Sequence, residues 1–467
     1  MGSAGLNRAR DKMLAAGVDP VAVEVFAHYY RLLEHGETGM IPERSIEPLE
    51  MERLADLEVD PEAAGAAVRD TVVIKLNGGL GTSMGMDRAK SLLCVRRGLS
   101  FLDIIARQVL HLRQEYAATL PVVFMNSFRT SEDTMAALAR YEDLPVKGLP
   151  LEFLQNKEPK LLVKDLSPVS WPREPDLEWC PPGHGDIYTA LVGTGLLDTL
   201  IETGYRYAFV SNSDNLGAVP DARVAGWFAT SGAPFAIEAV RRTASDKKGG
   251  HFARRRSDGR IVLRETAQTP VEDQAALADL DRHRFASTNN LWFDLAALRD
   301  VVRARRGVLG LPLIRNVKNV DPSDPKSPEV IQIETAMGAA IEIFEGARTV
   351  EVERDRFVPV KTTNDLLVLR SDVYDLGPDY VMDQAAPQLP YVELDADYYR
   401  LVDEFDKRFP DGAPSLRHAA ALKVDGDWTF ERGVQVKGEV SLEEQRGAQR
   451  VAAGTVLGDE SPTGSRR

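Results

Sequence analysis

The sequence predicts an α/β fold built on a mostly parallel mixed sheet, and two observations carry this prediction. From Thr71 onward, short apolar runs rich in β-branched and aromatic residues recur along the chain. Helix-compatible stretches such as FLDIIARQVLHLRQEY and TSEDTMAALARY separate several of these runs. Strands that alternate with helices are typical of a parallel sheet covered on both faces. The expected strands are TVVIKL, PVVFMN, LEFLQN, YAFVSN and PFAIEAV, and we assign residues 66–377 to this domain.

Residues 1–65 precede this domain and are expected to form a helical segment. DKMLAAG and PVAVEVFAHYYRLLEHG carry apolar residues at helical spacing. The second of these ends at Gly36, and glycine is typical of helix C-termini.

The chain after residue 377 is expected to form a separate, smaller unit. A Pro-rich connector, GPDYVMDQAAPQLPYVELD, follows the α/β domain. Residues 390–455 predict a small β-rich domain because DWTFERGVQVKGEVSL alternates apolar and polar residues, with Gly between short strands. The small and polar residues of 456–467 predict a disordered tail.

Composition limits the classes of partner. The chain has 467 residues, 43% of them hydrophobic, and no uninterrupted apolar run long enough to span a membrane or to act as a secretory signal. Its two cysteines, Cys94 and Cys180, are expected to be reduced, buried thiols. These features predict a cytoplasmic protein without a membrane partner. The net charge of −14 disfavours nucleic acid as a partner, so any phosphate site must be local.

A glycine-rich loop is the strongest local signal for phosphate binding. The strand TVVIKL runs directly into Gly78, Gly79, Gly81 and Gly85, and Lys90 follows. Glycines allow the backbone to approach a ligand closely, and successive free N–H groups form a nest for anions. The loop therefore predicts a phosphate site to which Lys90 adds a point charge, with a purely structural turn as the alternative when the loop is taken by itself.

Two familiar phosphate loops do not fit this sequence. A Walker A loop needs Lys directly after its last Gly, whereas Lys90 lies five residues past Gly85. A dinucleotide fingerprint needs a third glycine, but position 84 is Met. In a Rossmann-type dehydrogenase the next strand would also end in an acidic residue, and PVVFMN ends in Asn126.

The loop resembles that of the eukaryotic-type UDP-glucose pyrophosphorylases, in which LNGGLGT-x-MG is followed by PKS. Here LNGGLGTSMG is followed by AKS, and further family motifs occur in the same order over about residues 70–375. They are FMNSF, FLQNKEPKL, WCPPGHGDIY, FVSNSDNLGA, DKKGG, STNNLWF, IQIETAMGAAIEIFE and RFVPVKTTNDLLVLRSDVY. Ala89, Ser213 and Met337 depart from the usual family residues. The chain ends soon after VQVKGEV, where many members continue, so homo-oligomer formation through the C-terminal region stays open.

The resemblance implies a Rossmann-like nucleotidyltransferase core and a specific reaction. A phosphate oxygen of glucose-1-phosphate attacks the α-phosphorus of UTP in line, giving UDP-glucose and pyrophosphate. Such transfers need positioning, charge neutralisation and Mg²⁺ rather than a protein nucleophile. The resemblance assigns catalytic roles to Lys90, Lys361 and Lys248. It assigns Mg²⁺ binding to Asp214, which ends the strand run YRYAFVSN.

The remaining predicted site residues bind the nucleotide and the sugar. The amide of Gln155 can donate and accept, which suits the edge of uracil, and Gly183 allows close approach to the base. For Gln155, an exposed structural position remains the alternative. The other expected nucleotide contacts are Leu76, Asn77, Gly78, Gly79, Asn212, Ser213 and Asp214. His184, Asn289 and Asn290 are expected at the sugar, with a buried structural role left open for the two asparagines.

Three other functions are weighed against this one. A uridylyltransferase for another sugar-1-phosphate, of the galactose or N-acetylglucosamine type, remains open. N-acetylglucosamine enzymes typically carry LAGGQGTRLG, from which Asn77 and Leu80 depart. A dehydrogenase is disfavoured by the glycine spacing. A catalytically silent nucleotide-binding regulator is disfavoured because Lys90, Asp214 and Lys361 are all present.

Overall fold

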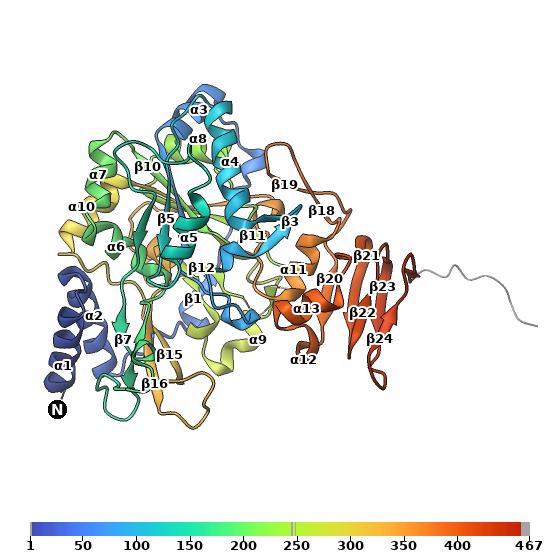
Figure 1. The fold of residues 1–467 in the computed structure, drawn as a ribbon. Coiled ribbons are helices and arrows are strands. Elements are labelled where there is room, and N and C mark those ends of the chain that lie inside the picture. Colours follow the sequence, from blue (N-terminus) through green and yellow to red (C-terminus); the bar gives the residue numbers. More distant parts are fainter. Residues whose placement is uncertain (1, 244–245, 248, 459–467) are drawn as a thin grey trace, which may run out of the picture.

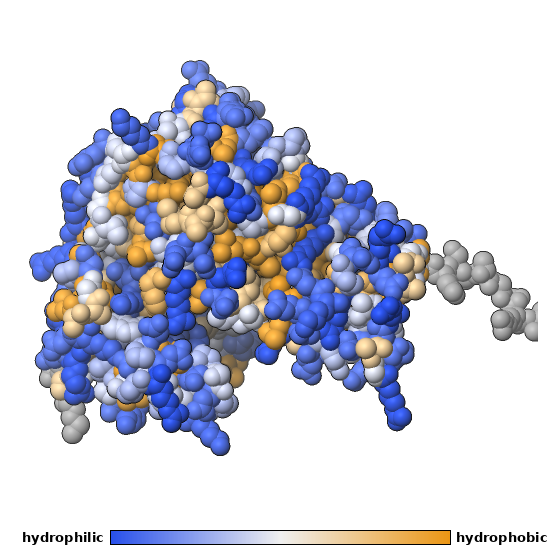
Figure 2. Space-filling view, viewed as in Figure 1, coloured by the Kyte–Doolittle hydropathy of each residue, from blue (hydrophilic) through white to orange (hydrophobic). Residues whose placement is uncertain are grey.

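The structure is a computed structural model that describes residues 2–243, 246–247 and 249–458. Its centre is a seven-stranded sheet flanked by helices, with two helices at the N-terminus and further strands at the C-terminal end (Figure 1). In the same view most of the surface is hydrophilic, and hydrophobic residues gather over the middle of the central domain (Figure 2). No helix in the described ranges is long and apolar enough to cross a membrane.

The central sheet confirms the predicted mixed, mostly parallel arrangement. Only β14 runs antiparallel to its neighbours, and every other adjacent pair is parallel. These strands are buried on both faces, which explains their nearly continuous apolar sequences. Across the sheet the order is β17 (Arg348–Glu351), β11 (Phe235–Arg241), β14 (Phe285–Asp294), β10 (Tyr207–Asn212), β2 (Thr71–Asn77), β5 (Val122–Asn126) and β6 (Glu152–Leu154).

Alternate strand residues feed two separate hydrophobic cores, one on each face of the sheet. Val73 and Phe209 pack into the first core, whereas Ile74 and Val210 pack into the second. The first core is covered by α3 (Pro61–Arg69), α4 (Phe101–Glu115), α5 (Ser131–Leu138) and α8 (Ala222–Ser231). The second is covered by α6 (Ile187–Gly193), α7 (Leu196–Glu202) and α10 (Leu295–Ala304).

The N-terminal segment is attached to the central domain by a helical pair and a strand. Helices α1 (Gly2–Ala15) and α2 (Pro20–Glu34) pack on a small sheet of β15 (Ile314–Asn319), β16 (Glu329–Glu334) and β8 (Leu161–Leu162). Asp19 caps α2, whose first residue is proline. The segment also contains β1 (Ile46–Pro48), which pairs with β12 (His251–Arg255), and β12 pairs in turn with β13 (Ile261–Arg264).

The C-terminal region is built from parallel strands. One set is β20 (Tyr391–Leu394), β21 (Ser415–Val424), β23 (Gln435–Leu442) and β25 (Val456–Leu457), and a second pairs β22 (Trp428–Phe430) with β24 (Gln449–Val451). Strand β25 extends into the segment that we expected to be a tail, because its two residues continue the β23 ladder. Residues 459–467 lie outside the described residues.

The remaining elements are short and connect these units. They include α9 (Gln274–Leu277), α11 (Thr363–Arg370), α12 (Ala396–Tyr399), α13 (Val402–Arg408), β3 (Cys94–Arg96), β4 (Leu99–Ser100), β7 (Glu158–Pro159), β9 (Trp179–Cys180), β18 (Tyr374–Leu376) and β19 (Met382–Gln384). Both cysteines are free, as expected, but only Cys180 is buried. Cys94 is exposed, because β3 lies in a two-stranded hairpin outside the main sheet.

Candidate active site

A cavity of about 280 Å³ opens where the parallel strands β2, β5, β6 and β10 end. The carboxyl ends of parallel strands meet at one edge of a sheet, which is the usual place for a ligand in α/β proteins. The cavity is lined by Leu76, Asn77, Gly78, Gly79, Lys90, Ser91, Met125, Gln155, Pro181, Gly183, His184, Asn212, Ser213 and Asp214. Every nucleotide-binding residue predicted from the sequence is in this set, together with Lys90 and His184.

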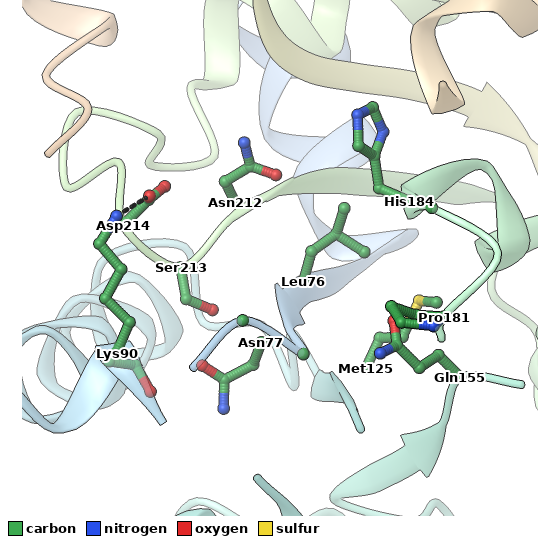
Figure 3. A pocket seen from close by; sticks show the side chains of 14 residues that line it. Leu76, Asn77, Lys90, Met125, Gln155, Pro181, His184, Asn212, Ser213 and Asp214 are labelled. Carbon is green, nitrogen blue, oxygen red and sulfur yellow. Dashed lines mark hydrogen bonds and ion pairs between the residues drawn. The ribbon is translucent and has the colours of Figure 1, made fainter. Parts of the chain in front are cut away.

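The cavity has two chemically different ends. Figure 3 shows Lys90 and Asp214 at one end, and Gln155 and Pro181 at the other. Lys90 Nζ donates to Asp214 Oδ2 at 2.7 Å and to the Val360 carbonyl oxygen. One end therefore carries charged groups, and the other presents an amide and apolar surface.

Gln155 is fixed at the uncharged end by its backbone and by Gly78. Its N–H donates to the carbonyl of Asn126 at 2.8 Å, which places it directly after β6. A Cβ on Gly78 would lie 2.8 Å from Gln155 Nε2, closer than real Cβ contacts allow. Position 78 therefore needs glycine so that the Gln155 amide can lie against the loop.

The family resemblance implies UTP as the ligand, and replacement of Gly78 by alanine is then expected to weaken UTP binding, because the new methyl group displaces the Gln155 amide. Isothermal titration with UTP would measure the loss, which we expect to be about tenfold, as for one misplaced hydrogen-bonding group. A Cβ on Gly79 would meet no protein atom within 4 Å, so Gly79→Ala adds the same methyl group without displacing a protein atom. Gly79→Ala should keep the parent Tm. A Gly78→Ala variant with unchanged UTP affinity would contradict the placement of Gln155.

His184 presents one hydrogen-bond donor to the cavity. Its Nδ1 accepts the Met337 N–H at 2.9 Å. The ring surface is open to the cavity, yet protein surrounds it on the other sides, and this desolvation lowers the pKa of His184 to about 4. The ring is therefore neutral near pH 7, and its proton resides on Nε2. His184 can donate to a ligand oxygen but cannot act as an acid at neutral pH.

Two buried hydroxyls also line the cavity. Ser91 and Ser213 are 2% and 4% exposed, and neither hydroxyl has a hydrogen-bond partner within the described part of the chain. Because buried polar groups are nearly always paired, these hydroxyls are suited to bind a polar ligand or ordered water. Ser213 is one of the residues that depart from the family pattern.

Asp214 is the residue best placed to hold a metal ion. Its side chain is 24% exposed and faces the cavity. Among the described residues, no group of three or more His, Cys, Asp or Glu side chains could hold a metal by itself. One carboxylate suits Mg²⁺, which keeps several waters and takes other ligands from substrate phosphates. The residues present therefore fit this ion.

Three predicted residues that the structure describes, Asn289, Asn290 and Lys361, are not among those that line the cavity. Asn290 is fully buried and its Nδ2 donates to Glu238 Oε2 at 3.0 Å. Asn289 has a φ of +58°, and its Oδ1 lies 3.4 Å from the Ser287 hydroxyl. Lys361 is exposed, and it lines an adjacent cleft of about 620 Å³. Lys248 lies outside the described residues.

Three cavity residues were not singled out from the sequence, although each lies in a motif that was. Met125 belongs to FMNSF, Pro181 to WCPPGHGDIY and Ser91 to AKS. Met125 and Pro181 give the uncharged end its apolar surface. The direct adjacency of Met125 to the strand end at Asn126 is the signal that would have identified it.

Comparison with known proteins gives a consistent result. Residues 23–437 match the family model described as UTP–glucose-1-phosphate uridylyltransferase. The chain is 37% identical over 400 residues to the UTP–glucose-1-phosphate uridylyltransferase of Pyrus pyrifolia, covering 85% of this chain and 82% of the relative. It is 36% identical over 419 residues to that of Solanum tuberosum, covering 88% and 85%.

Solved structures agree with the sequence comparison. The open and closed UDP-glucose pyrophosphorylase structures from Leishmania major superpose with a TM-score of 0.92 and 41% identity, covering 97% of this chain and 98% of the other. A mutant of the Leishmania major UDP-glucose pyrophosphorylase, solved in complex with UDP-glucose, gives a TM-score of 0.91 and 40% identity, with the same coverage.

Proposed function

This chain belongs to the UTP–glucose-1-phosphate uridylyltransferase family, and from that we infer that it transfers the uridylyl group of UTP to glucose-1-phosphate. The products are UDP-glucose and pyrophosphate. The observation that supports this most is the two-ended cavity, with Gln155 at one end and the Lys90–Asp214 pair at the other. A uridine triphosphate has the same polarity, since it joins a flat uncharged base to a charged chain.

The reaction needs no nucleophile from the protein. An oxygen of the glucose-1-phosphate phosphate forms a bond to the α-phosphorus of UTP, and the bond from that phosphorus to the bridging β-oxygen breaks. The electron pair leaves with pyrophosphate. The attacking phosphate is already ionised at neutral pH, so no proton has to be removed. The chain must bring two anions together and hold them in line.

We propose that lysine side chains and one carboxylate bring the two anions together and hold them in line. We assign Lys90 to the triphosphate, and Lys361 and Lys248 to the phosphates on the sugar side. Asp214 would hold Mg²⁺, which supplies charge neutralisation at the α-phosphate when bound. Family members generally use a divalent metal, and the choice of Mg²⁺ is part of this proposal.

We assign recognition of the sugar to His184 and Asn289. His184 donates from Nε2 to a sugar hydroxyl or phosphate oxygen, and its neutral form follows from its lowered pKa. Asn289 is the second proposed sugar contact. Its neighbour Asn290 acts through the buried network that it joins with Glu238.

Pyrophosphate release from UTP across a panel of sugar-1-phosphates tests the proposed function. We expect glucose-1-phosphate to give the highest kcat/KM. A higher value for galactose-1-phosphate or N-acetylglucosamine-1-phosphate would replace the proposed substrate with the related one. UTP binding without pyrophosphate release from any of them would indicate a silent regulator.

UTP is expected to be preferred over CTP. Cytosine presents an amino group where uracil presents a carbonyl, and a mismatched base leaves buried groups unpaired. A glutamine amide can flip to suit either base, so the fixed backbone groups near Gly78 and Gly183 must enforce the choice. Steady-state kinetics with both nucleotides would measure it, and comparable kcat/KM values would refute the assignment of the uncharged end to uracil.

We also propose a cytoplasmic location, with neither membrane nor nucleic acid as a partner. Two free cysteines and the charge of −14 support this.

Any homo-oligomer would form through the C-terminal region, where β25 is the last strand of its sheet and its outer edge has no partner strand within the described ranges. Light scattering of the full chain and of a truncation from residue 395 would test this.

A further inference from the structure

Two arginines on one short helix reach to two different loops of the site. Helix η11 (Arg354–Arg356) follows β17 and precedes the segment that ends at Lys361. Arg356 donates to the carbonyl of Val219, in the turn that carries Asp214, whereas Arg354 donates to the carboxylate of Asp246. The mechanism described above uses neither arginine.

The Arg356 guanidinium is held by a fully buried carboxylate. Its Nε donates to Glu238 Oε2 at 2.6 Å, and a terminal nitrogen donates to Oε1 at 2.7 Å. The same terminal nitrogen donates to the carbonyl of Val219 at 2.9 Å, at the far end of the turn. Asn290 and Trp292 each donate to one oxygen of Glu238. Paired charge-assisted bonds of this kind fix direction as well as distance.

The turn after β10 is bonded to the same segment through its own residues. Asn215 Oδ1 accepts the Val358 N–H at 2.8 Å, and Asn215 Nδ2 donates to the Arg356 carbonyl at 3.1 Å. The Asp214 carbonyl accepts the Val360 N–H at 3.1 Å. Side chain and backbone therefore hold the turn against the segment that leads to Lys361.

Backbone packing between the turn and η11 leaves no room for a side chain. A Cβ on Gly217 would lie 2.1 Å from the carbonyl oxygen of Asp355. The two backbones are therefore in direct contact, and a displacement of η11 towards the turn must move the turn as well.

The other arginine holds the loop that follows β11. Arg354 bonds both carboxylate oxygens of Asp246, at 2.8 and 3.2 Å. The Thr243 N–H and hydroxyl each donate to the same carboxylate at 2.9 Å. Burial raises the pKa of Asp246, but the bonds from Arg354 and Thr243 outweigh it and lower the pKa below its ordinary value.

Buried Arg242 supports the same loop from beneath. It donates to the carbonyls of Asp246, Lys247 and Gly249 at 3.0, 3.3 and 3.3 Å. The described part of this loop is thus fixed at its backbone by Arg242 and at its Asp246 carboxylate by Arg354. Asp246 of this loop and Arg354 line the same cleft as Lys361, which we assign to the phosphates on the sugar side.

We propose that η11 positions two elements separately, with Arg356 fixing the turn that carries Asp214 and Arg354 fixing Asp246 in the cleft that Lys361 lines. Both arginines are positioning residues, since they act through Glu238 and Asp246. The proposal rests on the proposed function for the identity of the two substrates. It predicts that substitution of Arg356 affects the turn that carries Asp214, and that substitution of Arg354 affects Asp246.

Lysine substitutions test the two contacts separately. Lysine keeps the positive charge but loses the planar fork that bonds two oxygens. We expect Arg354→Lys to raise the KM for glucose-1-phosphate about tenfold and to leave the KM for UTP unchanged. We expect Arg356→Lys to lower kcat about 100-fold and to raise the Mg²⁺ concentration needed for half activation, because Asp214 is displaced.

Each substitution has a partner and a control. Asp246→Asn should reproduce Arg354→Lys, and Glu238→Gln should reproduce Arg356→Lys, because each breaks the same pair from its other side. Arg241→Lys is the matched control. The Arg241 side chain pairs with Glu351 at 2.8 Å at the same edge of the sheet and forms no hydrogen bond with the described residues of either loop, and only its backbone carbonyl accepts from Arg354.

Hydrogen exchange gives a readout that does not depend on activity. Amides of Thr243, Asp246, Lys247 and Gly249 should exchange faster in Arg354→Lys alone, and amides of 213–219 faster in Arg356→Lys alone. Uniform acceleration that includes the central strands would show a general loss of stability and would overturn the proposal. The proposal would also be overturned if Arg354→Lys changed the KM values for UTP and glucose-1-phosphate equally. Kinetics of Arg354→Lys or Arg356→Lys that match those of Arg241→Lys would overturn it as well. If the parent protein released no pyrophosphate but the two variants still showed these separate exchange patterns, the proposed function would be contradicted and the positioning roles would stand.

Discussion

Replacement of Asp214 by asparagine is expected to lower kcat by about 100- to 1000-fold, on the order of 3–4 kcal/mol of transition-state stabilisation. The substitution removes the negative charge that would hold Mg²⁺ and keeps an oxygen that can accept from Lys90 Nζ, which lies 2.7 Å from Asp214 Oδ2. The fold should therefore survive while the chemistry is lost. Pyrophosphate release at saturating UTP and glucose-1-phosphate measures the effect.

A carboxylate on the outer surface serves as the control. Asp198 lies on α7, its side chain is 54% exposed, and its partner is Arg303. Asp198→Asn should retain parent activity. An Asp214→Asn variant with parent kcat, or full activity of the parent enzyme in excess chelator, would contradict the metal assignment.

Replacement of Lys361 by alanine is expected to be more damaging than replacement of Lys248, with a loss in kcat/KM of about 100-fold for Lys361→Ala. Lys361 directly follows Val360, whose N–H and carbonyl bond to Asp214 and Lys90. Its backbone is thus held beside the charged end, and we propose that its side chain contacts the phosphates of both substrates. Steady-state kinetics of the two variants would decide.

Lys326 is exposed, and its replacement by alanine controls for the loss of one positive charge from the protein. Lys326→Ala should leave both KM values and kcat unchanged. Equal and mild effects of the Lys361 and Lys248 substitutions would show that the cleft lined by Lys361 is not continuous with the phosphate site.

The sequence predicted the strands and most of the cavity because both depend on local patterns. TVVIKL and YAFVSN are mostly apolar runs, and each ends in or leads straight into residues that line the cavity. Parallel pairing of β2 with β10 then brings Leu76 beside Asn212. A local pattern combined with one topological rule was sufficient here.

Contacts between distant segments were not predictable in this way. Asn290 was expected at the sugar, but its amide bonds to Glu238, 52 residues earlier in the chain. The direction of β14 depends on its two neighbours, and no apolar pattern encodes it. The pairing of β1 with β12 likewise joins residues about 200 positions apart, so a helical reading of residues 1–65 could not include it.

Isotope tracing by ³¹P NMR tests the central claim most directly. Glucose-1-phosphate labelled with ¹⁸O in its phosphate oxygens would be incubated with UTP, Mg²⁺ and the enzyme. If the sugar phosphate attacks the α-phosphorus, every labelled oxygen remains in UDP-glucose, including the new bridge between its two phosphorus atoms, and pyrophosphate carries none. Label in pyrophosphate, or release of orthophosphate in place of pyrophosphate, would contradict uridylyl transfer as the reaction of this cavity.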